Sequence, residues 1–168
     1  VASQGPALDG LRSYIRMVND AGGVKGNKIN LIEKDDAYNV AKALGNVKSF
    51  INDDGVVLVT GIGNSSGFAS ILPVLNAAKM PALVNQGTLK SNTNPFQPYM
   101  FQGNCNYGDQ AEVALAYTQI RAKLKSLKGV KVGIAGIEVA SGQEWIQVLK
   151  DKVEKAGVIH AGIGKVSF

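Results

Sequence analysis

The sequence predicts an α/β fold in which a mostly parallel sheet is flanked by helices. Three observations support this prediction. Apolar residues at helical spacing alternate along the chain with short apolar segments of strand length. The connections between these segments are short, as in repeated strand–helix units. The run from Val56 to Thr60 is continuously apolar, which is typical of a strand buried on both faces of a parallel sheet.

The first half of the chain predicts alternating helices and strands. Its first helix should stop at the pair Gly22-Gly23, because glycine readily adopts the left-handed conformation that ends helices. The strand after it should end at Asp35-Asp36. In order, we expect a helix over residues 8–18, a strand over 29–34, a helix over 40–51, a strand over 56–60, a helix over 68–75 and a strand over 81–84.

The second half continues the same alternation after a loop. Residues 85–98 are rich in Asn, Ser, Thr and Pro, a composition that favours turns. The elements expected after this loop are an extended segment over 99–102, a helix over 108–127, a strand over 130–135, a helix over 143–156 and a strand from residue 158 onward.

Composition excludes several classes of protein. Hydrophobic residues make up 45% and charged residues 18% of the 168 residues, so the chain should fold rather than remain disordered. No apolar run approaches the roughly 18 residues of a membrane span. The single cysteine, Cys105, and single histidine, His160, favour neither a disulfide nor a metal site, and we expect no cofactor. The net charge of +5 is spread along the chain, which does not favour nucleic-acid binding.

Polar residues and glycines follow each predicted strand, where ligands bind in parallel sheets. Asp35-Asp36 could hold a cation or act as acid and base, but this pair more often ends a strand and favours the start of a helix. The other strand-end segments are residues 61–67, 85–88 and 136–142.

Residues 63–67 fit the Gly-x-Ser-x-Gly pattern of a hydrolase nucleophile, with Ser65 as nucleophile. His160 would be its only imidazole base. The sequence has no matching oxyanion segment, and His160 starts a predicted strand instead of following one, so we do not favour an enzyme. The acids that could complete such a triad are Asp109, Glu138 and Asp151.

The same loop allows two other interpretations, and only one of them requires residues that the sequence lacks. Gly61-Ile62-Gly63 resembles a dinucleotide-binding turn, but Ser66 stands where glycine or alanine is wanted and no acid ends the next strand. Alternatively, residues 61–67 form an amide-rich loop that opens a helix, and N–H groups at a helix N-terminus attract a carboxylate. The hydroxyls of Ser65 and Ser66 would add donors, so we prefer this second interpretation.

The order of motifs resembles a known family. Residues 18–29 read Val-Asn-Asp-Ala-Gly-Gly-Val-Lys-Gly-Asn-Lys-Ile, and Asp35-Asp36-Ala37 follows the next predicted strand. This pattern is similar to type I periplasmic binding proteins, in the branch of the leucine/isoleucine/valine-binding protein, which serve ABC importers. The resemblance covers nearly the whole chain and is strongest from Asp9 to Leu75.

The resemblance implies a two-lobed α/β protein with a ligand in the cleft between the lobes, of which only part is present. Residues 1–104 would be a first lobe that lacks its first strand, and residues 105–168 the start of the second lobe. The chain would first cross between lobes near residues 102–107.

The resemblance also implies which residues bind the ligand. Asn64 and Ser65 would contact its carboxylate, and Gln86, Gly87 and Thr88 would contact its amine and carboxylate. Ser141 occupies the second-lobe position at which many relatives carry an aromatic residue, so that position offers no ring for stacking. Ser65 and Thr88 should lie on loops at the carboxyl ends of adjacent strands and face an open groove, with His160 out of reach.

The function implied is capture of a small polar ligand, an amino acid or related carboxylate, in the periplasm for a membrane-bound ABC permease. A ligand-sensing regulatory module on the same fold is the alternative. A serine hydrolase that uses Ser65 is the third hypothesis and the one we favour least.

Overall fold

The computed structural model describes residues 4–167, which pack as two units, one through Ala37 and the other from Tyr38 onward. In the first unit, helix α1 (Gln4–Asp20) ends where predicted, because the N–H groups of Gly22 and Gly23 bond to carbonyls of its last turn. Gly23 has a φ of +80°, and a Cβ placed there would lie 2.0 Å from the carbonyl oxygen of Asn27. Only glycine fits this turn.

The strand predicted over residues 29–34 is wrong: the structure has no strand there. The backbone of Ile29 forms hydrogen bonds with the side chain of Asn19 instead. The Ile29 N–H donates to Asn19 Oδ1 (2.7 Å), and Asn19 Nδ2 donates to the Ile29 carbonyl (2.8 Å). An apolar segment becomes a strand only when a neighbouring strand accepts its hydrogen bonds. Within the described part of the first unit, the only β pairing is a single bridge between Val24 and Asn27.

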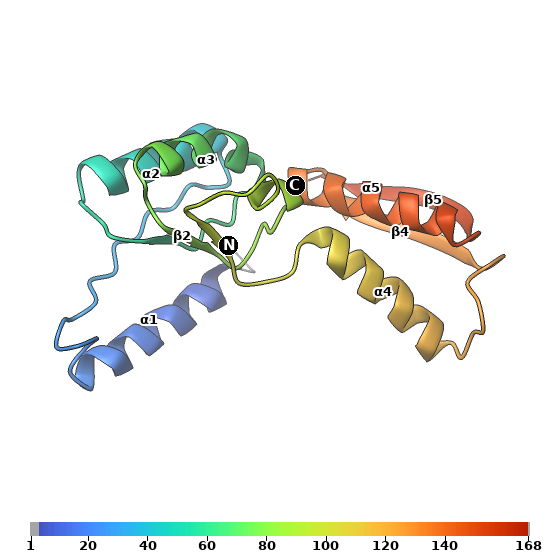
Figure 1. The fold of residues 1–168 in the computed structure, drawn as a ribbon, viewed down its shortest axis with the longest axis horizontal. Helices are drawn as coiled ribbons and strands as arrows, with labels where there is room; N and C mark the ends of the chain where they lie inside the picture. The colour runs from blue at the N-terminus through green and yellow to red at the C-terminus, as the bar shows by residue number, and fades with distance from the viewer. Residues whose placement is uncertain (1–3, 168) are drawn as a thin grey trace. The chain divides into compact units, whose positions relative to one another are not determined.

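The second unit contains a parallel sheet of three strands in the order β1 (Val59–Thr60), β2 (Ala82–Val84) and β3 (Met100–Gln102), and the sequence predicts this parallel arrangement (Figure 1). Asn39 caps helix α2 by accepting a hydrogen bond from the N–H of Lys42 at 2.9 Å. The elements are α2 (Val40–Asn52), β1 (Val59–Thr60), a 3-10 turn η1 (Ser65–Gly67), α3 (Phe68–Ala77), β2 (Ala82–Val84), a 3-10 turn η2 (Lys90–Asn92) and β3 (Met100–Gln102).

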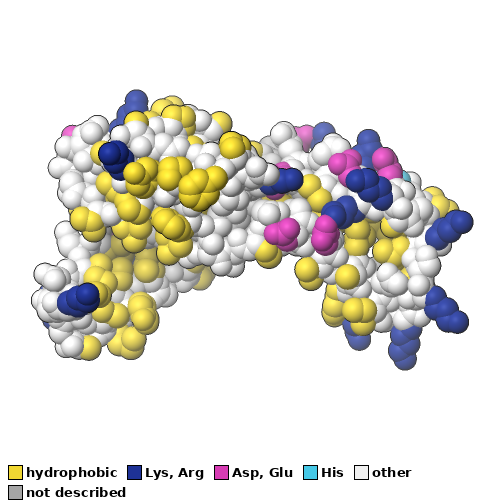
Figure 2. Space-filling view, viewed as in Figure 1, with side chains coloured by type: hydrophobic (Ala, Val, Ile, Leu, Met, Phe, Trp, Pro, Cys, Tyr) yellow, Lys and Arg dark blue, Asp and Glu magenta, His cyan; other side chains and the backbone are white. Residues whose placement is uncertain are grey.

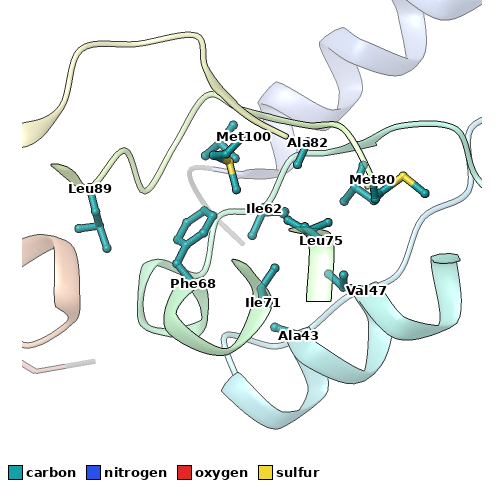
Figure 3. Packing of buried hydrophobic residues seen from close by; sticks show 12 residues of the cluster. Ala43, Val47, Ile62, Phe68, Ile71, Leu75, Met80, Ala82, Leu89 and Met100 are labelled. Atoms are coloured by element: carbon teal, nitrogen blue, oxygen red, sulfur yellow. The ribbon is translucent and has the colours of Figure 1, made fainter. Parts of the chain in front are cut away.

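Helix α3 lies at the centre of the core of this sheet (Figure 3). Phe68, Ile71 and Leu75 recur on one face of the helix and are at most 1% exposed. They pack in one cluster with residues of α2, including Ala43 and Val47, and with residues of the strands. This packing fixes the start of α3, and therefore the η1 turn that precedes it.

Of the strand predicted over residues 56–60, only the last two residues form a strand. Val59 is buried, but Val57 is 88% exposed and Leu58 is 47% exposed. Strand β1 is an edge of the described sheet, so its outer side has no neighbour that could extend the pairing to these two residues.

The remaining elements form a second parallel pair of strands, β4 (Lys131–Ile137) and β5 (Ile159–Val166), along which α5 (Ala140–Lys155) lies (Figure 1). Helix α4 (Tyr107–Arg121) is shorter than the predicted 108–127. It ends because Lys123 has a φ of +52° and its N–H bonds back to Ile120. Ala111, Ile134, Leu149 and Val153 form the core here.

Hydrophobic side chains also reach the surface of this part of the chain. Val113, Tyr117 and Ile120 follow helical spacing on α4 and are all more than 60% exposed, and Figure 2 shows hydrophobic side chains on the surface around this helix. Every residue of β5 is exposed. Within residues 4–167, no helix combines the length and hydropathy of a membrane span. The predicted lobe boundary between residues 104 and 105 stays a prediction.

Candidate ligand-binding site

The loops that follow β1 and β2 touch each other, because adjacent parallel strands end at the same edge of the sheet. The contact is made by Gly87, whose φ is +66°. A Cβ placed on Gly87 would lie 3.1 Å from Phe68 Cε2 and 3.5 Å from Ser65 Cα. The structure therefore brings the predicted segments around Ser65 and Gly87 together, as expected from their strand-end positions.

Ser65 is the most connected polar residue of this region. Its side chain is 2% exposed, and its Oγ lies 3.2 Å from the Tyr38 hydroxyl and 3.2 Å from Ser141 Oγ, to which it donates. The backbone N–H of Ser141 donates to the same oxygen at 3.3 Å. A hydroxyl has one proton and two lone pairs, so these three contacts use its whole hydrogen-bonding capacity.

Ser65 and Ser66 together cap the N-terminus of α5 from a distant part of the chain. The N-cap residue of α5 is Val139, which has no side-chain acceptor to offer. The two serines supply the missing acceptors. Ser66 Oγ accepts from the N–H of Ala140 at 3.4 Å, and Ser65 Oγ accepts from the N–H of Ser141. Because the same two serines open the η1 turn that leads into α3, two helix N-termini converge on them. Helix N-termini carry partial positive charge, so this arrangement suits an anion.

Thr88 lies on the β2 loop, and its hydroxyl is already used within the protein. It is 2% exposed and donates to the carbonyl of Cys105 at 2.9 Å. The prediction that Ser65 and Thr88 face an open groove is therefore wrong for this structure. The first turn of α5 covers Ser65, and the backbone at Cys105 covers Thr88.

Asn64 and Gln86 differ in how exposed they are to solvent. Asn64 is 1% exposed, and neither atom of its amide has a hydrogen-bond partner among the described residues. A Cβ on Gly67 would lie 3.7 Å from both Asn64 Cγ and Ala43 Cβ, so the Asn64 side chain lies on the α2 side of its loop. Gln86 is half-buried.

His160, the base that a hydrolase would need, lies at the opposite end of β4 from Ser141, which bonds to Ser65. His160 pairs with Val132 near the start of β4, whereas Ser141 follows the end of β4. At roughly 3.3 Å per strand residue, the length of β5 from His160 to Val166 is about 20 Å. The hydrogen-bond partners found for Ser65 are Tyr38 and Ser141, and neither is the imidazole that the hydrolase hypothesis requires.

A pocket of about 350 Å³ lies beside Ser141 at the carboxyl end of β4. Its aromatic residues, Tyr107 and Trp145, were not among the predicted site residues. Trp145 fits the amphipathic pattern of a helix, and Tyr107 precedes the helix expected over residues 108–127. Two of its lining residues are glycines, and a Cβ on Gly142 would lie 1.9 Å from the Ile137 carbonyl oxygen. The lining residues are Tyr107, Gln110, Gly136, Ile137, Ser141, Gly142 and Trp145.

Metal binding has no support in the described part of the chain, where no three His, Cys, Asp or Glu residues are grouped to hold an ion. Asp35 is instead used in a turn, in which its Oδ1 accepts a hydrogen bond from the N–H of Ala37 at 2.9 Å. The role predicted for the Asp35-Asp36 pair, to end a strand and favour the start of a helix, is not what the structure shows, because no strand precedes the pair and Asn39 caps α2.

Comparisons with known proteins agree on one family and one fold. The sequence profile of the family described as periplasmic binding protein matches residues 1–168. A curated relative, the Leu/Ile/Val-binding protein homolog 3 of Brucella melitensis, is 25% identical over 149 residues, which are 89% of this chain and 39% of the relative.

Solved structures share the fold at lower identity. An ABC transporter substrate-binding protein from Desulfitobacterium hafniense in complex with Leu has a TM-score of 0.77 at 19% identity, over 95% of this chain and 46% of that one. A solute-binding protein from Rhodopseudomonas palustris in complex with 3,4-dihydroxybenzoic acid has a TM-score of 0.78 at 22% identity, over 99% and 44%. The chain thus spans less than half the length of these relatives.

Proposed function

The chain belongs to the periplasmic binding protein family, and from this premise we propose that it is part of a protein that captures a small carboxylate for an ABC importer. The family is one of non-catalytic solute-binding proteins. The proposal further places the protein in the periplasm, with a membrane permease as its partner. The ligands named for two relatives, Leu and 3,4-dihydroxybenzoic acid, are both carboxylates and support this ligand class.

One observation supports the carboxylate most directly, namely the convergence of two helix N-termini on Ser65. The N–H of Ser141 and the hydroxyls of Ser65 and Ser66 supply donors within one small region. We propose that a carboxylate takes the place of the contacts between Ser65 and Ser141 and receives these donors. Gly87, which lies between Gln86 and Thr88 in the sequence, brings the β2 loop against Ser65.

The test is a titration of the 168-residue chain with acetate and with larger carboxylates, followed by NMR. Because the chain spans less than half the length of its relatives, we expect weak binding, with the amides of residues 65, 66, 140 and 141 shifting most. Ser65→Ala should weaken this binding by roughly tenfold, the usual cost of one hydrogen bond to a charged group. Ser13→Ala, an exposed serine on α1, is the matched control and should change nothing. Binding that survives Ser65→Ala unchanged, or shifts confined to other residues, would refute the assignment.

A further inference from the structure

We propose that the end of the β4–β5 pair at which α4 and α5 finish is a docking surface for a membrane that contains anionic lipids. This surface does not involve the candidate carboxylate site, and the proposal does not rest on the proposed function. Six exposed basic residues make up the surface, which we call the basic end: Arg121, Lys123, Lys125, Lys128, Lys131 and Lys155.

The sequence around α4 and β4 lacks acidic residues. Lysine and arginine are spread along the chain, but residues 113–137 contain five of them and no Asp or Glu. The chain has 18 basic and 13 acidic residues in all, so the residues outside this segment carry equal numbers of the two charges. Only this segment has basic residues that no acid in its own stretch of sequence balances.

The fold holds this segment at the amino end of β4. The N–H of Gly129 donates to the carbonyl of Gly157 at 2.8 Å, and Leu127 is buried. These contacts join the loop after α4 to the loop after α5, whose last turn carries Lys155. Figure 2 shows dark blue side chains without magenta ones at the lower right, where α4 ends in Figure 1. The candidate carboxylate site is at the other end of β4, roughly 20 Å away at about 3.3 Å per strand residue.

The charges of the basic end have no acidic partner inside the described part of the protein. Within residues 4–167, none of its six side chains forms an ion pair or a hydrogen bond with a carboxylate. Glu154 is the one acidic residue next to the basic end in the sequence, and it is itself exposed. Like charges held close together repel one another, so an external anionic surface would stabilise this arrangement.

The helix dipoles explain only part of this cluster. Arg121 and Lys155 lie in the last turns of α4 and α5, where a cation interacts favourably with the negative end of the dipole. Lys125, Lys128 and Lys131 lie beyond the ends of both helices. These three lysines therefore have no stabilising role of that kind within the fold.

Apolar side chains next to the charges favour a lipid bilayer over a soluble polyanion. Tyr117 and Ile120 are 61% and 73% exposed in the last turns of α4, directly before the first basic residue. A bilayer interface offers phosphates to basic side chains and hydrocarbon to apolar ones, and tyrosine is enriched at that depth. A nucleic acid offers the phosphates but no comparable surface for an aliphatic side chain such as that of Ile120.

The experiment measures cosedimentation of the 168-residue chain with lipid vesicles. One vesicle is made of phosphatidylcholine alone, and in the other every third lipid is phosphatidylglycerol. We expect binding to the second vesicle only, and loss of most of that binding when the NaCl concentration is raised about tenfold, because salt screens charges at a surface. Equal binding to both vesicles, or binding to neither by a chain whose circular dichroism shows it to be folded, would overturn the proposal.

A triple variant tests whether the basic end makes the contact. Lys123→Gln, Lys125→Gln and Lys128→Gln are combined in one chain, and all three positions are exposed. Each lysine close to an anionic membrane strengthens binding about fivefold. We therefore expect the triple variant to bind the phosphatidylglycerol vesicles about 100-fold more weakly.

The matched control removes the same charge elsewhere in the chain. Lys25→Gln, Lys42→Gln and Lys48→Gln change three exposed lysines outside the basic end. Lys25 and Lys123 also share a positive φ, +51° and +52°, so the two sets place glutamine in similar backbone conformations. The control should bind nearly as well as the unchanged chain. Equal losses in the two triple variants would show that net charge alone attracts the chain, and would overturn the assignment of the surface.

A single variant separates the bilayer from a soluble polyanion. Ile120→Ser keeps every charge and should weaken vesicle binding several-fold, because the isoleucine no longer leaves water for hydrocarbon. Its binding to a single-stranded oligonucleotide should not change. Val57→Ser, at a position 88% exposed near β1, is the control and should change neither. Vesicle binding that Ile120→Ser leaves intact, or tighter binding to the oligonucleotide than to the vesicle, would overturn the membrane as the partner.

Discussion

Gly142→Ala tests whether the turn between β4 and α5 is as tight as the structure shows. In a helix interior, replacing glycine by alanine normally stabilises a protein by about 0.5–1 kcal/mol, because alanine loses less backbone entropy on folding. Here the added Cβ would lie 1.9 Å from the Ile137 carbonyl oxygen and 2.8–2.9 Å from the carbonyl carbon and nitrogen of the same residue. All three atoms belong to the backbone and cannot turn away.

The size of the clash determines the sign of the effect. An ordinary contact to a Cβ begins near 3.4 Å, so the start of α5 must move by about 1.5 Å from Ile137. Overpacking of this kind costs about 1–3 kcal/mol, which exceeds the gain in helix propensity. We therefore expect Gly142→Ala to lower the free energy of unfolding by roughly 1–2 kcal/mol, since the two effects oppose each other.

Urea denaturation measures this change, followed by circular dichroism and by the fluorescence of Trp145, which stands one turn from the substitution. Gly45→Ala is the matched control, because Gly45 also lies inside a helix, α2, but no atom lies within 4 Å of its added Cβ. The control should raise the free energy of unfolding by about 0.5–1 kcal/mol. The reasoning is refuted if both substitutions stabilise the chain.

Three further predictions concern other parts of the chain. Asn39→Ala removes the acceptor for the N–H of Lys42 and should cost about 1 kcal/mol in urea denaturation, whereas Asn39→Asp, which keeps an acceptor, should cost much less. Leu75→Ala, at a core position 1% exposed, should cost about 3–5 kcal/mol by the same assay, and a cost below 1 kcal/mol would contradict the packing in Figure 3. The hydrogen bond from Arg12 holds the pKa of Glu33 below its ordinary value, so its stabilising effect is present above that ordinary value and is lost as the pH falls through the lowered one. NMR titration should show the pKa of Glu33 rising in Arg12→Ala, and an unchanged value would show that the pair does not form in solution.

Local patterns were sufficient for the helices and for the parallel arrangement of the strands. The apolar spacing from Leu8 to Val18 and the stop at Gly22 reappear in α1, because both act within a few residues of chain. The residues over 29–34 and Val57 have strand-like character, but whether they pair depends on neighbours far away in the sequence. No local pattern contains that information.

The candidate site could also be predicted only in part. The meeting of the β1 and β2 loops could be predicted, since parallel strands carry their following loops to one edge of the sheet. The contact between Ser65 and Ser141 joins residues 76 positions apart, and it buried a hydroxyl that we expected to be open. Trp145 was not predicted as a site residue, because a tryptophan on an amphipathic helix is most often a core residue.

The burial of Ser65 also bears on how tightly a carboxylate could be held. An entering ligand must replace contacts of 3.2–3.3 Å between Ser65 and Ser141, both of them between uncharged groups. Such hydrogen bonds contribute about 0.5–1.5 kcal/mol each, whereas bonds from the same donors to a carboxylate contribute about 1.5–3 kcal/mol. The net gain from exchanging two bonds is therefore on the order of 2–3 kcal/mol, which is too little for tight binding by the charged end alone. Under the proposed function, most of the affinity must then come from other parts of the ligand.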